Sequence, residues 1–268
     1  MTPLYILKIG GSVATYKNRP GIALRHVLLP QIARAIKESQ KKKKFGLILI
    51  HGAGGVGHRL AMKYGLQKGT RNNKNKWQGA LISRLTNQKL NTAITEIFIA
   101  ENLRVTPVHT ASTIIQKNKK IIDCDIKIIK ESLEQKCIPL LYGEMVFDKT
   151  LGMSICSGDA LASYLAQSLK ADKIFFASDI NGLYTQDPYI NKNAKLMEQL
   201  SLSEIHKNIQ LSKSHNIDVT GGLSGKIENL ISLSGSSLES IEIFNGFNPS
   251  NYQKALLGQK FPHTIITV

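Results

Sequence analysis

Features that define several classes of protein are scarce or absent in this 268-residue sequence. No apolar run approaches the roughly 18 residues of a membrane-spanning helix, and the first apolar residues lead into a pair of glycines rather than into a signal-peptide cleavage region. The three cysteines, Cys124, Cys137 and Cys156, are widely spaced and form no CxxC pair, which argues against a disulfide framework and against a zinc site. We therefore expect a cytoplasmic protein that does not bind membranes and whose cysteines are small buried residues.

Acidic and aromatic residues are also few. The chain has 19 Asp and Glu against 35 Lys and Arg, a formal net charge of +16, and its aromatic content is 6%. Such an excess of positive charge favours anionic partners, and RNA is one of them. However, the lysines are scattered over residues 41–44, 63–76 and 117–120, without the interleaved aromatic side chains on which bases stack. We predict solvated lysine faces and no nucleic-acid partner, and the basic field would attract small anionic substrates.

The apolar residues that are present suffice for a sizeable core. They make up 42% of the chain, with a mean hydropathy of −0.11, so we expect one domain over residues 1–268. Short apolar runs alternate with helical periodicity, which predicts an α/β fold. The predicted strands are residues 4–9, 45–50, 105–109, 138–142, 173–177, 241–244 and 264–268, and the predicted helices are residues 24–38, 56–64, 79–102, 125–136 and 157–169. Hairpins are predicted at residues 112–122 and 145–155, and Pro30 is expected to kink the first helix.

The stretch from Leu47 to His58, LILIHGAGGVGH, is the most informative in the sequence. Its apolar residues are few enough for one buried strand, and four glycines follow within six residues. Glycines let successive backbone N–H groups converge on an anion, and the helix that follows directs its positive end to the same place. A glycine-rich turn after a strand also serves simply to reverse the chain, so this motif alone leaves both interpretations open.

Two further motifs place charged side chains near glycines. Lys8 precedes the glycines of KIGGS, where its ammonium group either reaches a phosphate or lies in solvent at a strand edge. Lys17 follows in a polar loop. Ser157 caps a predicted helix whose first turn contains Asp159, and this carboxylate either faces a ligand or only complements the helix dipole.

The second half of the chain adds two more motifs. Residues 178–188, SDINGLYTQDP, form a long loop at the carboxyl end of a strand, where open α/β sheets bind nucleotides. Residues 218–230, DVTGGLSGKIENL, have three glycines before a predicted helix with Lys226 in its first turn.

In this order, the five motifs resemble the amino acid kinase family, and its isopentenyl phosphate kinase branch in particular. That branch has a glycine turn ending in a histidine, here His58, and the DVTGG-x-x-x-K ending, here Asp218 to Lys226. The sequence departs from the branch pattern at Ala53, Gly55, Val56 and Ala160.

The resemblance implies a three-layer α/β sandwich with a mostly parallel open sheet of about eight strands. It implies an acceptor lobe over about residues 1–155, an ATP lobe over about residues 156–268, and a homodimer. ATP would be the phosphoryl donor, and Mg²⁺ would arrive with ATP and take few protein ligands, so no metal-binding residue is named. The tail of the acceptor would lie among the residues of the helix at 81–98 and the segments after it.

The resemblance also implies roles for individual residues. Those implied in catalysis are Lys8, Lys17, His58, Asp159 and Lys226. Those implied in nucleotide binding are Lys8, Gly10, Gly11, Ser12, Gly54, Asp179, Gly222 and Lys226, and those implied in acceptor binding are Ala53, His58 and Gly158. Lys17 would stabilise the transferring phosphoryl group, Lys226 would contact the γ-phosphate, and Asp159 would orient the lysines.

Phosphoryl transfer requires the kind of groups that these motifs contain. Its loose transition state needs positioning and positive charge, which lysines, glycine-turn amides and Mg²⁺ supply. A phosphate monoester has a second pKa of about 6, so it is already an anionic nucleophile near pH 7 and needs no general base. His58, with a reference pKa near 6.5, would be protonated beside a dianion.

The expected reaction is the ATP-dependent conversion of isopentenyl phosphate to isopentenyl diphosphate by in-line transfer. The alternatives are a kinase for another small phosphate or phosphonate such as fosfomycin, a non-catalytic nucleotide-binding protein of the same fold, and an RNA-binding module.

Overall fold

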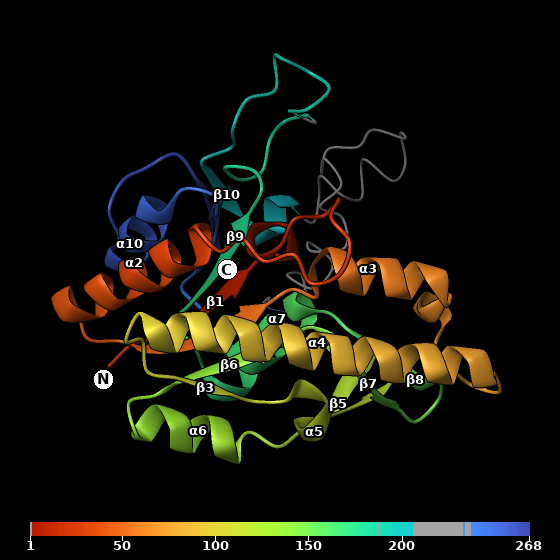
Figure 1. Ribbon diagram of the computed structural model, residues 1–268. Coiled ribbons are helices and arrows are strands. Elements are labelled where there is room, and N and C mark those ends of the chain that lie inside the picture. Colours follow the sequence, from red (N-terminus) through yellow and green to blue (C-terminus); the bar gives the residue numbers. More distant parts are fainter. Residues whose placement is uncertain (1, 187, 206–232, 234–236) are drawn as a thin grey trace.

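An eight-stranded sheet runs through the centre of the molecule, and the computed structural model describes residues 2–186, 188–205, 233 and 237–268 (Figure 1). The strands are β1 (Leu4–Ile9), β2 (Gly46–His51), β3 (Val105–Pro107), β4 (Ile114–Lys117), β5 (Lys120–Cys124), β6 (Ile138–Tyr142), β7 (Glu144–Asp148), β8 (Gly152–Cys156), β9 (Lys173–Ser178), β10 (Gln199–Ser201), β11 (Ser240–Asn245) and β12 (Thr264–Thr267). The helices are α1 (Gly11–Ala14), α2 (Leu28–Lys42), α3 (Gly54–Lys63), a 3₁₀ turn (Leu66–Lys68), α4 (Lys74–Ala100), α5 (Thr110–Thr113), α6 (Lys127–Glu134), α7 (Gly158–Leu169) and α10 (Pro249–Leu257). No helix within these described ranges has both the length and the apolar character that a membrane span requires.

The large sheet is mostly parallel, with strand order β10-β12-β11-β9-β1-β2-β6-β3. Strand β1 lies between β2 and β9 and runs parallel to both, and β11, β6 and β3 continue the same direction. At one edge β12 is antiparallel to β11, and β10 runs parallel to β12. The predicted mostly parallel sheet of about eight strands is therefore confirmed.

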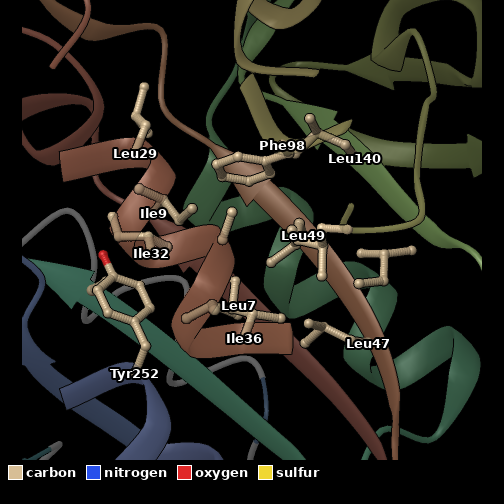
Figure 2. Packing of buried hydrophobic residues seen from close by; sticks show 14 of the residues in the cluster. Leu7, Ile9, Leu29, Ile32, Ile36, Leu47, Leu49, Phe98, Leu140 and Tyr252 are labelled. Atoms are coloured by element: carbon tan, nitrogen blue, oxygen red, sulfur yellow. The ribbon is translucent and has the colours of Figure 1, made fainter. Parts of the chain in front are cut away.

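Helices cover both faces of this sheet, which makes three layers. In β1, Leu7 and Ile9 join a core with residues of α2, α4 and α10, whereas Ile6 joins a core with residues of α6 and α7. Figure 2 shows Leu7 and Ile9 among Ile32 and Ile36 of α2. Both faces of the strands are buried, which explains why the strands are continuously apolar rather than alternating. Each such side chain contributes about 1.5–3 kcal/mol of hydrophobic stabilisation.

A smaller sheet of four strands, in the order β5-β4-β7-β8, stands beside the large one. Both hairpins, β4–β5 and β7–β8, were predicted, but their union through the parallel pair β4–β7 was not. Asp148 connects them. Its carboxylate accepts backbone N–H groups on both hairpin turns, together with the Ser154 hydroxyl; the backbone donors are Asn118, Lys119, Thr150 and Leu151, at 2.8–3.1 Å. These bonds lower the pKa of Asp148 to about 2 despite its burial, so the carboxylate stays ionised.

Several helices begin at other residues than predicted. The helix predicted at 24–38 is α2, Leu28–Lys42, so Pro30 lies in its first turn, where a missing N–H does not interrupt the helix. The helix predicted from residue 79 begins at Lys74, where the Asn73 side chain caps it by accepting the N–H of Lys76. Trp77 packs in this first part of α4, against a small cluster that includes Met153.

The remaining differences concern short elements. The strand predicted at 105–109 ends at Pro107, and His109 stands at the start of α5 with its Nδ1 2.9 Å from the Tyr142 hydroxyl. Helices α1 and α5 and strand β10 are too short for a periodic signal. Helix α10 was not predicted, although Asn248 caps it, Pro249 begins it and Gly258 ends it. The predicted glycine turn and helix at residues 218–230 lie outside the described residues.

Candidate functional site

The candidate site lies at the point where the strand order of the large sheet reverses. From β1 the chain passes to β2 on one side and returns later to β9 on the other. Ile9 pairs with both His51 and Ala177, so the three strands end level with one another. Open α/β sheets bind ligands at this kind of switch point, beyond the carboxyl ends of the strands. The loops after β1, β2 and β9 therefore meet there.

The loops after β1 and β2 touch through their backbones. A Cβ atom on Gly11 would lie 2.7 Å from the nitrogen of Gly54, and one on Gly52 would lie 2.7 Å from the nitrogen of Gly11. No side chain can occupy such a gap, since real Cβ contacts with backbone are not this short. The glycines are thus required for the close approach of these two loops.

The glycine-rich segment after β2 is part of a helix. The prediction of a turn followed by a helix at 56–64 was wrong at its start, because α3 already begins at Gly54, whose φ of +65° favours glycine. The Thr15 hydroxyl accepts the N–H of Gly55 and donates to the carbonyl of Gly11, at 3.1 and 2.9 Å. Thr15 thereby ties the start of α3 to the loop after β1.

The start of α7 places further backbone N–H groups beside these loops. Ser157 caps this twelve-residue helix by accepting the N–H of Ala160, as predicted. In its first turn Asp159 Oδ1 lies 3.0 Å from Lys8 Nζ, and both side chains are largely buried. A partly buried ion pair of this kind fixes the lysine in one position. Lys8 therefore points from the end of β1 towards the N-terminus of α7.

Lys17 lies across the switch point from Lys8. Its Nζ is 3.1 Å from Oδ2 of Asp179, which follows β9, and its carbonyl accepts a 2.8 Å hydrogen bond from Arg59 of α3. Burial raises the pKa of Asp179, but Lys17 and the Ser12 hydroxyl overcome this and hold the pKa below its ordinary value. Asp179 is therefore ionised and keeps Lys17 near the loops.

A cavity of about 180 Å³ opens beside these groups. One end is lined by residues of the loops and helix starts described above: Lys8, Gly11, Gly52, Ala53, Gly57, His58, Gly158 and Asp159. The rest of the lining comes from α3, α4 and the small sheet, together with Gly143 and Ser157 beside the start of α7: Ala61, Ser83, Asn87, Gly143, Glu144, Met145, Ile155, Cys156 and Ser157. The cavity therefore joins the glycine-rich, positively charged residues at the strand ends to a wall of mixed character. In this wall Ala61, Met145, Ile155 and Cys156 are apolar, and Ser83, Asn87 and Glu144 are polar.

The two histidines of the glycine stretch differ. His58 lines the cavity, and burial, Lys17 and Lys8 lower its pKa. It is therefore neutral near pH 7 while the cavity holds no anion. His51 is fully buried, its pKa falls to about 4 through burial, and its ring lies 3.0 Å from the Gly52 carbonyl and 3.1 Å from the Asn91 amide. A neutral His51 can donate to the carbonyl and accept from the amide, so it supports the loop from behind.

A sequence model of the amino acid kinase family matches residues 3–245. The chain belongs to this family.

Its relatives in the amino acid kinase family include isopentenyl phosphate kinases. The chain is 32% identical to the isopentenyl phosphate kinase of Methanothermobacter thermautotrophicus, with 98% of this chain and 99% of that protein covered. It is also 32% identical to that of Methanocaldococcus jannaschii, with 96% of each covered. A solved structure described as isopentenyl phosphate kinase superposes with a TM-score of 0.84 at 27% identity, over 98% of this chain and 100% of that one.

The structure brings most of the residues named from the family resemblance to one place. Lys8, Gly11, Ala53, His58, Gly158 and Asp159 line the cavity. Gly10, Ser12, Lys17, Gly54 and Asp179 lie in or beside the adjoining loops. Gly222 and Lys226 lie outside the described residues.

Ala53, a departure from the usual family motif, fits without strain. Its φ of −63° and ψ of −9° are ordinary for alanine. Its methyl group lies where a Cβ on Gly57 would clash with it, so the methyl fills space that Gly57 leaves free. Alanine at position 53 therefore leaves the backbone of the glycine stretch unstrained and adds a methyl group to the cavity wall.

The part of the cavity lined by α3, α4 and the small sheet is called the inner end below. Its residues were not identified from the sequence. The acceptor tail was expected beside the helix at 81–98, and Ser83 and Asn87 do come from it. However, Leu81 and Leu85, which suggested an apolar face, are exposed, whereas Asn87 is buried. Buried polar residues spaced along a helix carry no periodic apolar signal, so only the packing of α4 against the small sheet reveals them.

Proposed function

We propose that this protein is a kinase that uses ATP to phosphorylate isopentenyl phosphate, giving isopentenyl diphosphate. The observation that carries the proposal is a cavity that joins cationic, glycine-rich strand ends to a wall containing Ala61, Met145 and Ile155, in a chain that aligns almost end to end with isopentenyl phosphate kinases. A small phosphate monoester with a short hydrocarbon tail matches both ends.

The phosphate of the acceptor would bind at the end of the cavity that contains His58 and Gly158. The N-terminus of α7 offers backbone N–H groups and the positive end of its dipole. Lys8 is positioned there by Asp159. A dianionic phosphate beside His58 would raise the pKa of this histidine again and make it a hydrogen-bond donor.

ATP would bind over the adjoining loops, in an ATP lobe over about residues 156–268 that faces an acceptor lobe over about residues 1–155. Lys8 would reach its phosphates, Gly10, Gly11, Ser12 and Gly54 would direct backbone groups to them, and Asp179 and Gly222 would border the nucleotide. Lys17 would leave Asp179 to stabilise the transferring phosphoryl group, and Lys226 would contact the γ-phosphate.

Mg²⁺ would be held mainly by the phosphate oxygens of ATP. Asp159 and Asp179 each pair with a lysine, and no group of three or more His, Cys, Asp or Glu close enough to hold a metal occurs in the described part of the chain. When bound, the ion supplies positive charge to the bridging phosphate oxygens.

The exposed apolar residues support our proposal of a homodimer. Leu81 and Leu85 lie one turn apart on α4, and the ring of Phe147 on β7 lies 5.8 Å from the guanidinium of Arg84. Phe147 pairs in register with Ile115 of β4, which is also exposed. Light scattering would show a dimer, and Leu85→Glu would yield monomer.

We place the protein in the cytoplasm.

The direct test is ADP release with Mg-ATP and a panel of acceptors. The panel contains isopentenyl phosphate, dimethylallyl phosphate, geranyl phosphate, fosfomycin, acetylglutamate and UMP. We expect a clear preference for isopentenyl phosphate. Preferential turnover of fosfomycin, or turnover of none of them, would contradict the proposal.

A further inference from the structure

The inner end of the cavity contains two buried polar side chains among apolar neighbours. Asn87 of α4 and Glu144 of β7 are each only 2% exposed, and both line the cavity together with Met145 and Ile155. A pocket for a purely hydrocarbon tail gains from apolar walls alone, whereas a buried polar group requires a hydrogen-bond partner.

The amide of Asn87 has a defined orientation. Its Nδ2 donates a 3.4 Å hydrogen bond to the carbonyl of Gly143, and the reverse orientation would set two oxygens against each other. Its Oδ1 lies on the side of Gly57, 3.4 Å from where a methyl group on that glycine would be. Among the residues that the structure describes, this oxygen has no hydrogen-bond partner.

The carboxylate of Glu144 also has one oxygen with a backbone hydrogen-bond partner and one without a partner among the described residues. Its Oε2 accepts a 3.0 Å hydrogen bond from the N–H of Ala111, and its Oε1 has no partner within the described residues. Burial raises the pKa of Glu144 to about 7, although the Ala111 N–H, the charge of Arg84 and a side-chain hydrogen bond with Tyr142 oppose this. A buried acceptor without a donor costs about 1–3 kcal/mol of folding stability, so two of them beside one cavity call for an explanation.

We propose that Asn87 and Glu144 recognise a hydrogen-bond donor on the carbon chain of the acceptor, so that the cavity also takes short hydroxyalkyl monophosphates. This inference rests on the proposed function, since it concerns the tail of the same acceptor. The acceptor's phosphate would stay at the end with Lys8 and His58, and its hydroxyl group would donate to Asn87 Oδ1 or to Glu144 Oε1.

The test compares two acceptors that differ by one molecule of water: isopentenyl phosphate and 3-hydroxy-3-methylbutyl phosphate. The quantity is the ratio of kcat/KM for the hydroxylated acceptor to kcat/KM for isopentenyl phosphate. In Asn87→Leu, which keeps a similar volume, we expect this ratio to fall at least about tenfold from the wild-type value, as for the loss of one hydrogen bond.

Asn91→Leu is the matched control. Asn91 is buried one turn further along α4 and contacts His51, but it does not line the cavity. We expect it to leave the ratio as in the wild type. An unchanged ratio in Asn87→Leu would overturn the inference, and a water molecule would then satisfy the oxygen of Asn87.

Binding measurements separate this inference from the proposed function. Calorimetry gives the dissociation constants of both acceptors with wild-type protein, whether or not either is phosphorylated. If neither acceptor turns over, the proposed function fails, while the inference still predicts that the hydroxylated compound binds at least as tightly as isopentenyl phosphate. Binding more than about tenfold weaker would overturn the inference, even if Asn87→Leu does not fold.

Discussion

The two ends of the cavity are built from different parts of the chain. The phosphate end consists of backbone and short charged motifs at the ends of β1 and β2 and at the start of α7, each preceded by a strand and containing glycine. The inner end consists of side chains from α3, α4, β7 and β8, none of which belongs to such a motif. If the protein acts as we propose, anion binding would depend on local geometry, and binding of the acceptor's tail would depend on how distant elements pack.

The largest expected effect concerns Lys8, at the phosphate end. Lys8→Met keeps much of the apolar stem but removes the ammonium that Asp159 positions. We expect kcat to fall about 10²- to 10³-fold, the usual loss when one preorganised charge-stabilising group is removed. Steady-state kinetics with isopentenyl phosphate measure this, and unchanged melting would show that the fold persists. A kcat close to wild type would mean that Lys8 is not part of the reacting centre.

The second-largest expected effect concerns Glu144 at the inner end of the cavity, whose burial should make the free energy of unfolding depend on pH. The pKa of Glu144 is raised to about 7 in the folded protein, from an ordinary value of 4.5. Wild-type stability should therefore fall as pH rises from about 4.5 to about 7, by up to about 3 kcal/mol. Urea unfolding of Glu144→Gln should lack this loss.

A glutamate at the surface provides the control. Glu134 at the end of α6 is exposed, so Glu134→Gln should show the same dependence on pH as the wild type. Parallel stability curves for the wild type and Glu144→Gln between pH 4.5 and 8 would show that Glu144 is not buried as described.

A smaller effect tests the backbone contact at the phosphate end. In Gly52→Ala the new Cβ would lie 2.7 Å from the nitrogen of Gly11, and neither backbone can yield easily. We expect about 1–3 kcal/mol of destabilisation, as for overpacking, together with reduced kcat. Gly21→Ala is the contrast, because Gly21 has a positive φ but no atom within 4 Å of a Cβ. It should lose stability only through backbone strain and should retain kcat.

The smallest effect concerns His58, an exposed residue that lines the cavity beside Gly57. His58→Ala removes one hydrogen-bond donor to the acceptor phosphate, so we expect the acceptor KM to rise about tenfold and kcat to change less. Lys17→Ala, in comparison, should mainly lower kcat. Wild-type kinetics in both variants would refute the arrangement of donor and acceptor that we propose.

The two ends of the cavity also differ in how far their residues could be predicted from the sequence. The strand–glycine–helix order at Lys8, Gly52 and Ser157 indicated both the α/β fold and the position of the phosphate end, because each motif is local in sequence. The exact start of α3 could not be predicted, since glycine usually ends helices and here lies within one. The glycine at position 54 is required instead by contact with Thr15 and Gly11.

The inner end could not be predicted for a different reason. Asn87 and Glu144 face the cavity only because α4 extends beyond the large sheet and packs on β7. The union of the two hairpins into one sheet depends on Asp148, whose carboxylate looks in the sequence like an ordinary turn residue. Such tertiary contacts leave no spacing pattern along the chain.

Asp148 has a consequence for how this part of the molecule opens. One carboxylate holds the turn at Asn118 and Lys119 and the turn at Thr150 and Leu151. Neither turn can detach without leaving that buried charge short of donors, so the two hairpins should open as one cooperative unit. In hydrogen exchange, the four amides bonded to Asp148 should therefore share one protection factor. The hydrogen-bonded amides of β7 and β8, which line the cavity, should have the same protection factor.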